Sequence, residues 1–123
     1  MKLKINETYL TESVSTQDIR DSISNRKFIV ITYEGTDGTH NQKRMIMPVA
    51  FGLTKSGYPV IRAFETFGDT KTIVPEWKFF RVDRISSWRD TNKVFHEIDR
   101  RFHSNGDRTM RVVYNIADFN KQS

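Results

Sequence analysis

The apolar residues follow two different spacings along the chain. These spacings predict one short helix followed by a series of strands. Ile19 and Ile23 lie four residues apart, which is the spacing of one helix face. Either Ser15 or Thr16 is suited to cap the first turn of such a helix. The pattern therefore predicts a helix over residues 16–25.

The segments after this helix are rich in β-branched and aromatic residues, or they alternate apolar with polar side chains, as strands do. Turn residues such as Gly57 separate them. Pro48 has no amide hydrogen, so we expect a sheet edge or a bulge there. The predicted strands cover residues 27–33, 43–51, 58–64, 77–85 and 110–116, of which the first is buried on both faces and the first three form a meander.

Short strands separated by glycine and asparagine turns predict a mainly β fold with one or two short helices, arranged as a small β-barrel preceded by an N-terminal helix. Residues 95–102 fit one or two helical turns, with Phe95, Ile98 and Phe102 on one face. With 123 residues and 37% hydrophobic side chains, the chain has material for one core. We assign residues 1–14 to an N-terminal arm and residues 15–123 to a single domain.

Composition narrows the function classes. The formal charge is +5, and six basic residues against two acidic ones fall between residues 26 and 62. The absence of cysteine excludes disulfides and thiolate metal sites. No apolar run is long enough for a membrane helix, and the first residues lack the apolar block of a signal peptide. We expect a cytoplasmic protein with no membrane partner.

Catalytic motifs are missing as well. The sequence has no Gly-x-Ser-x-Gly elbow, no glycine-rich phosphate loop and no His-Glu-x-x-His pair. Its three histidines do not have a short metal-ligand spacing, and we interpret them as surface residues. We therefore expect no enzyme activity, no catalytic residues, no cofactor and no metal. Most phenylalanines are assigned to the core.

Basic residues on predicted strands give the candidate ligand site. Strands are rigid supports, and guanidinium groups on neighbouring strands grip phosphates in a bidentate way. Tyrosine or tryptophan side chains beside them, such as Tyr33, Tyr58 or Trp77, are suited to stack on bases. The opposing interpretation is a solvated strand face whose arginines pair with Asp83 or Glu76. The candidate ligand-binding residues are Arg44, Arg62, Lys78, Arg81, Arg84 and Tyr33, with Arg44, Arg62 and Arg81 as the first choices.

Arg84 has a second interpretation. In a regular strand it shares one face with Phe80 and Val82, so it points inward. Either Arg84 is a structural arginine held by buried partners, or the strand bulges at this point.

The ordered set of these segments resembles the WYL domain family over about residues 17–88. The resemblance is carried by Ile19 to Ile23, then Ile31-Thr32-Tyr33, Arg44 followed by Met47-Pro48, Gly57 through Ala63-Phe64, and above all Phe80-Arg81-Val82-Asp83-Arg84-Ile85. One departure is clear, because Pro59-Val60-Ile61 stands where the family has its Trp-Tyr-Leu tripeptide.

The resemblance implies a small Sm- or SH3-like barrel that senses nucleic acid or nucleotides, in a family usually attached to DNA-binding helix-turn-helix domains or to defence enzymes. A freestanding protein of this kind is typical of phage genomes, which places it in the host cytoplasm or the virion. We expect a non-enzymatic regulatory or defence-related module that binds single-stranded nucleic acid or a small anionic nucleotide. The alternative is a phage assembly component or anti-defence inhibitor that acts through a protein partner or as a homo-oligomer.

Overall fold

The computed structural model describes residues 14–34, 42–68, 76–98 and 109–119. These residues form one α-helix, one 3-10 turn and an antiparallel sheet, so the prediction of a mainly β fold that follows a helix is confirmed. The elements are α2 (Thr16–Ser24), β1 (Lys27–Tyr33), β2 (Gln42–Leu53), β3 (Pro59–Gly68), β4 (Glu76–Arg81), η1 (Val82–Arg84), β5 (Ile85–Val94) and β6 (Val112–Ile116).

The predicted helix is confirmed, with its N-cap at Ser15. The Ser15 hydroxyl accepts a hydrogen bond of 3.1 Å from the amide of Asp18, which satisfies one of the free amides of the first turn. Ile19 and Ile23 are fully buried, so the spacing of four residues does mark the face that packs on the sheet.

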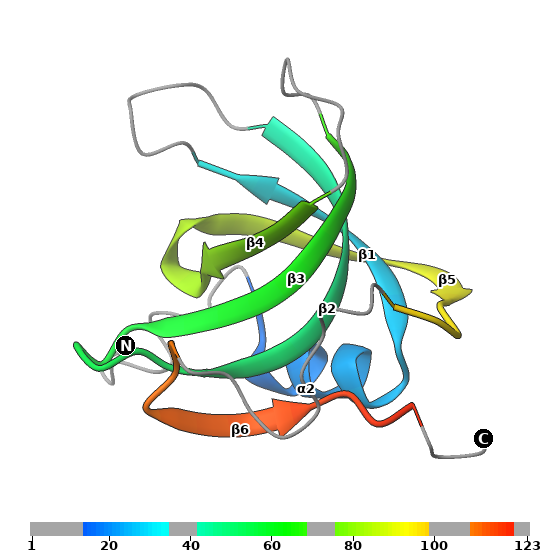
Figure 1. The fold of residues 1–123 in the computed structure, drawn as a ribbon. Helices are drawn as coiled ribbons and strands as arrows, with labels where there is room; N and C mark the ends of the chain where they lie inside the picture. Colours follow the sequence, from blue (N-terminus) through cyan, green and yellow to red (C-terminus); the bar gives the residue numbers. More distant parts are fainter. Residues whose placement is uncertain (1–13, 35–41, 69–75, 99–108, 120–123) are drawn as a thin grey trace.

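The long strand β2 organises the sheet. The strand order of the sheet is β4-β3-β2-β1-β5, and β6 also pairs with β2. The meander predicted for the first three strands is therefore confirmed. One edge of β2 pairs with β3, while the other edge pairs first with β1 and then with β6. Figure 1 shows β2 and β3 as long curved strands with β6 beside the end of β2. The register of β2 with β3 shifts between Pro48 and Ala50, so the predicted bulge is confirmed.

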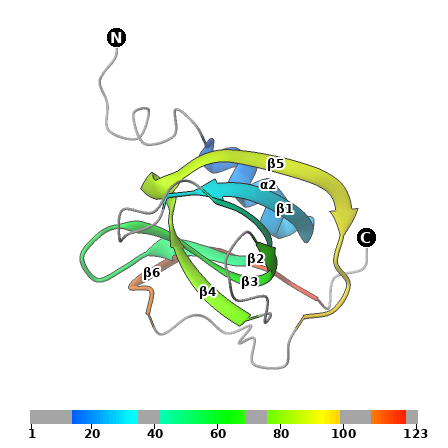
Figure 2. The ribbon, with the colours of Figure 1, turned by 90° about the horizontal axis from the view of Figure 1, so that it is seen from above.

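The predicted strand over residues 77–85 is wrong in its second half. β4 ends at Arg81, η1 turns the chain, and β5 then runs back along β1 (Figure 2). Contacts from β1 hold this corner, because the Tyr33 hydroxyl accepts from the Arg81 amide and the Glu34 amide donates to the Arg84 carbonyl, both at 3.0 Å. With Val82 buried at 2% exposure, the corner packs into the core.

Two other expectations need correction. Residues 95–98 are not helical, and residues 99–102 of that prediction lie outside the described part of the chain. Phe95 is instead a buried anchor whose ring meets Phe28 edge to face at 5.5 Å. Strand β1 is buried on one face only, because Ile29 and Ile31 are fully buried whereas its other side chains are half-buried.

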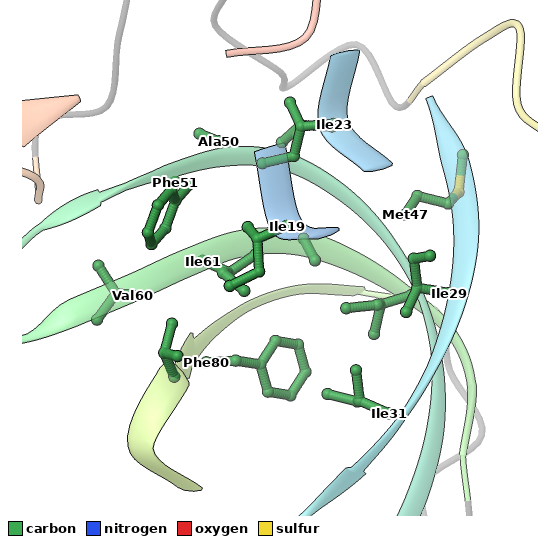
Figure 3. Packing of buried hydrophobic residues seen from close by; sticks show 14 of the residues in the cluster. Ile19, Ile23, Ile29, Ile31, Met47, Ala50, Phe51, Val60, Ile61 and Phe80 are labelled. Atoms are coloured by element: carbon green, nitrogen blue, oxygen red, sulfur yellow. The ribbon is translucent and has the colours of Figure 1, made fainter. Parts of the chain in front are cut away.

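The core lies between α2 and the curved sheet. Figure 3 shows side chains from α2, β1, β3 and β4 gathered in one cluster, among them Ile19, Ile31, Ile61 and Phe80. In the described residues β4 and β5 do not pair with each other, so the sheet is open where the sequence predicts a barrel. Within those same residues no helix has the length and apolar character needed to cross a membrane.

Gly52 allows β6 to approach β2. A Cβ atom at Gly52 would overlap the carbonyl oxygen of Val112. We predict that Gly52→Ala costs about 1–3 kcal/mol of unfolding free energy and that the β6 amides then exchange faster with solvent. Denaturant titration and hydrogen exchange measure these effects.

Gly57→Ala is the matched control. Gly57 has φ +89° and open space around it, so alanine there adds backbone strain without touching β6. If β6 exchanges as slowly in Gly52→Ala as in the parent protein, the close approach does not limit β6 docking.

Candidate nucleic-acid interface

The sheet separates the candidate residues onto two faces. We call the face that carries Phe80 and Ile61 the inner face, since these two residues oppose each other and are buried. Lys78 opposes the buried Ala63 and therefore shares this face. Three candidates lie on the inner face, namely Arg44, Lys78 and Tyr33. Arg62 and Arg81 lie on the outer face, and Arg84 lies in η1.

Arg44 lies in a polar cluster at the end of the inner face. Its Nη1 donates to both carboxylate oxygens of Glu65, at 3.1 and 3.3 Å, and its Nη2 donates to Gln42 at 3.0 Å. The Arg44 and Glu65 side chains are only 11% and 8% exposed. Lys78 Nζ stands 4.0 Å from Glu65 Oε1. Buried charges need such partners, so the hydrogen bonds favour a structural role for Arg44.

Aromatic rings complete the inner cluster. Tyr33 and Phe80 meet edge to face with their centroids 4.9 Å apart. The Arg44 guanidinium carbon lies 5.8 Å from the Tyr33 centroid and 5.9 Å from that of Phe80. Since the Tyr33 hydroxyl also accepts from the Arg81 amide, this tyrosine joins β1, β2 and β4 at their common corner.

Removing the charge of Glu65 tests the structural role of this cluster. We predict that Glu65→Gln lowers the unfolding free energy by about 3 kcal/mol, because Arg44 then stays buried without its counterion. Asp90→Asn is the control, since Asp90 is exposed and its pair with the half-buried Lys27, at 3.5 Å, is worth less than about 1 kcal/mol. Urea titration compares the two variants, and equal losses would contradict the role given to Glu65.

A second constellation occupies the outer face of the β3–β4 hairpin. Arg62 opposes Phe79, Phe64 opposes Trp77, and Val60 opposes Arg81. Directly opposed residues of antiparallel strands point to the same side, so these side chains share one face. We call the following six residues the outer-face ladder: Tyr58, Arg62, Phe64, Trp77, Phe79 and Arg81.

The ladder consists of two cation–ring pairs and one pair of rings. The Arg62 guanidinium carbon lies 4.2 Å from the Phe79 centroid, and that of Arg81 lies 3.9 Å from the Tyr58 centroid. Both distances are well inside the range of cation–π attraction. Phe64 and Trp77 meet edge to face at 5.3 Å. Tyr58 is 46% exposed and the Arg81 side chain 35% exposed, so the ladder presents polar and aromatic groups to solvent.

Each ladder arginine is also held at its tip. Arg62 Nη2 donates to the Thr109 hydroxyl at 2.9 Å. Arg81 forms a bidentate pair with Asp83, at 3.1 Å from Nε to Oδ1 and 2.6 Å from Nη2 to Oδ2. The hydrogen bond to Asp83 is the main reason that the pKa of Arg81 lies above its usual value, so the guanidinium stays charged at every accessible pH. An anion that approaches Arg81 therefore competes with the Asp83 carboxylate.

Several site expectations can now be compared with the geometry. Arg81 pairs with Asp83, as the opposing interpretation of a solvated strand face expects. Arg84 lies half-buried in η1, and its buried Nε has no hydrogen-bond partner within the described residues. The regular strand that would direct Arg84 inward is not present, because β4 ends at Arg81 and η1 follows, which is closer to the alternative of an irregular strand.

The sequence predicted only some of the residues of the outer-face ladder as binding residues. Phe64 and Phe79, assigned to the core, are half-buried and pack against it from the outer face. The signal for their position is that every second residue of 77–81, and positions 58, 62 and 64 of the facing segment, is a ring or an arginine. Among the described residues no group of three potential metal ligands comes together.

Comparison with known proteins gives no family for this chain. No protein-family model matches it, and neither a curated protein nor a solved structure matches it significantly.

Proposed function

We propose that the outer-face ladder binds single-stranded nucleic acid, and that the protein is a non-enzymatic binding module with a regulatory or defence-related role. The observation that carries the proposal is that Arg62 and Arg81 each stack on a partly exposed ring on the outer face of one hairpin. Guanidinium groups supply bidentate contacts to phosphate, and each base stacked on a ring contributes about 1–3 kcal/mol. Stacking needs accessible base faces, which single strands offer and duplexes do not.

The charges of the two faces support the choice of the outer one. On the inner face Glu65 neutralises Arg44, and the pair is largely buried. On the outer face Arg81 pairs with Asp83, which stands at the exposed corner η1. The Arg81 side chain is 35% exposed, against 11% for Arg44, so an anionic polymer meets less desolvation on the outer face.

The fold gives further support through the resemblance to WYL domains. A helix precedes the strand order β4-β3-β2-β1-β5, and a 3-10 turn of three residues joins the two strands at the ends of that order. We include in the proposal that this sheet belongs to the Sm- or SH3-like barrels. In another class of small barrel, the OB-fold, a strand face binds oligonucleotides.

The Arg81–Asp83 pair provides the test of the proposal. Asp83→Asn removes the carboxylate that competes with phosphate, so we predict tighter binding of an oligothymidylate by up to about fivefold. Arg81→Ala removes a charged donor and weakens binding about tenfold or more. Fluorescence anisotropy of a labelled single-stranded oligonucleotide measures both affinities, with the matching duplex as competitor.

Two matched variants on β5 serve as controls. Asp90→Asn changes the net charge as Asp83→Asn does, and Arg89→Ala changes it as Arg81→Ala does, but both residues are exposed on a strand that pairs with β1 rather than with the β3–β4 hairpin. The proposal predicts much smaller effects from them. If the β5 variants shift the affinity as much as the ladder variants do, binding follows net charge and the outer-face site is wrong.

A further inference from the structure

We infer that the ladder accommodates three successive nucleotides of an extended strand, laid along β3 and β4, without selecting their bases. The inference rests on the proposed function and assigns the size, direction and specificity of its site. It follows from the spacing of the rows, from the strand that flanks them and from the chemistry of the six side chains.

The rows repeat with the spacing of an extended nucleic-acid strand. Arg81 with Tyr58 forms the first row, Arg62 with Phe79 the second, and Phe64 with Trp77 the third. Successive rows are two residues apart on β4, which corresponds to roughly 6.7 Å along a strand. This rise is close to the length of one nucleotide unit in an extended chain, so each row meets one nucleotide.

The neighbouring strand β2 offers no binding groups to a nucleic-acid strand that would cross the sheet. On β2 the residues opposite the ladder are Met47 beside Phe64 and Ala50 beside Arg62. They are 8% and 2% exposed and carry no charge. Gly52 follows them, closely covered by the backbone of Val112. The usable platform is therefore one hairpin wide, and a bound strand extends along it.

The ladder side chains recognise features that all nucleotides share. Two of the six are guanidinium groups, which suit phosphates, and four are aromatic rings, which stack on any base. None of the six is an amide or a carboxylate, the groups that read the edges of adenine and cytosine. The two arginines, the residue type that reads guanine, lie flat on rings and are hydrogen-bonded to Thr109 and Asp83. The geometry thus favours binding that is independent of base sequence.

The number of guanidinium groups, two, also determines how strongly the binding affinity depends on salt concentration. Each phosphate neutralised on a single strand contributes about −0.7 to the slope of log K against log salt concentration. Contacts from Arg62 and Arg81 therefore give a slope of about −1.4, and loss of either arginine reduces its magnitude by about 0.7.

Calorimetric titration of the full chain with unlabelled oligothymidylates of one to ten nucleotides tests the inference. Affinity should rise with each nucleotide up to three and then grow only with the number of overlapping three-nucleotide frames. The trinucleotides of thymidine, deoxyadenosine and deoxycytidine should agree within about threefold. The decamer should show the slope of about −1.4, and Arg62→Ala and Arg81→Ala should each reduce it, whereas Arg89→Ala should not.

The outcomes separate this inference from the proposed function. Affinity that continues to rise steeply beyond three nucleotides, a slope steeper than about −3, or a tenfold preference for one base overturns the three-row site while single-strand binding itself stands. Binding to no oligonucleotide at low salt overturns both. Binding with the expected length dependence that Arg81→Ala and Arg62→Ala leave unchanged places a short site elsewhere and also overturns the inference.

Discussion

Every element of the described structure depends on β2 being paired along both of its edges. β3 occupies one edge, and β1 and β6 share the other, so this strand of 12 residues is buried through most of its length. The shift of register at Pro48 bends the strand, and the sheet then curves around the side chains of α2. The curvature creates an enclosed inner face and an outer face that is half-exposed along the β3–β4 hairpin, and it determines which arginines can meet a ligand.

The two faces treat the same residue type in opposite ways. Arg44 enters the enclosed face, where its charge requires Glu65 and leaves its terminal nitrogens occupied. Arg62 and Arg81 lie on the outer face, where rings support their flat surfaces and where Thr109 and Asp83 accept hydrogen bonds from their edges. The ion pair of Arg44 with Glu65 stabilises the inner end of the sheet. The proposed function depends on the ring-stacked arginines of the outer face. Asp83 has two effects, because its carboxylate holds the Arg81 side chain in place and also competes with a ligand phosphate for it.

Local signals predicted much of this fold from the sequence. Helix α2, the first three strands and the irregularity at Pro48 each follow from short-range spacing or from the missing amide of proline. Strand β5 was missed because residues 86–93 are almost all polar, and pairing with β1 rather than their own propensity makes them a strand. The turn η1 depends on tertiary bonds to Tyr33 and Glu34, which no local pattern shows. The partners of Arg44 likewise come from distant strands, so its face was not predictable.

The most direct measurement of the central claim is an NMR titration of the labelled protein with an oligothymidylate, which follows the aromatic ring signals of both faces. The account predicts that the rings of Tyr58, Phe79 and Trp77 shift on binding, while those of Tyr33 and Phe80 remain at their free positions. Shifts concentrated at Tyr33 and Phe80, or no shifts at any ring, would contradict the account, because the ligand would then use the inner face or not bind at all.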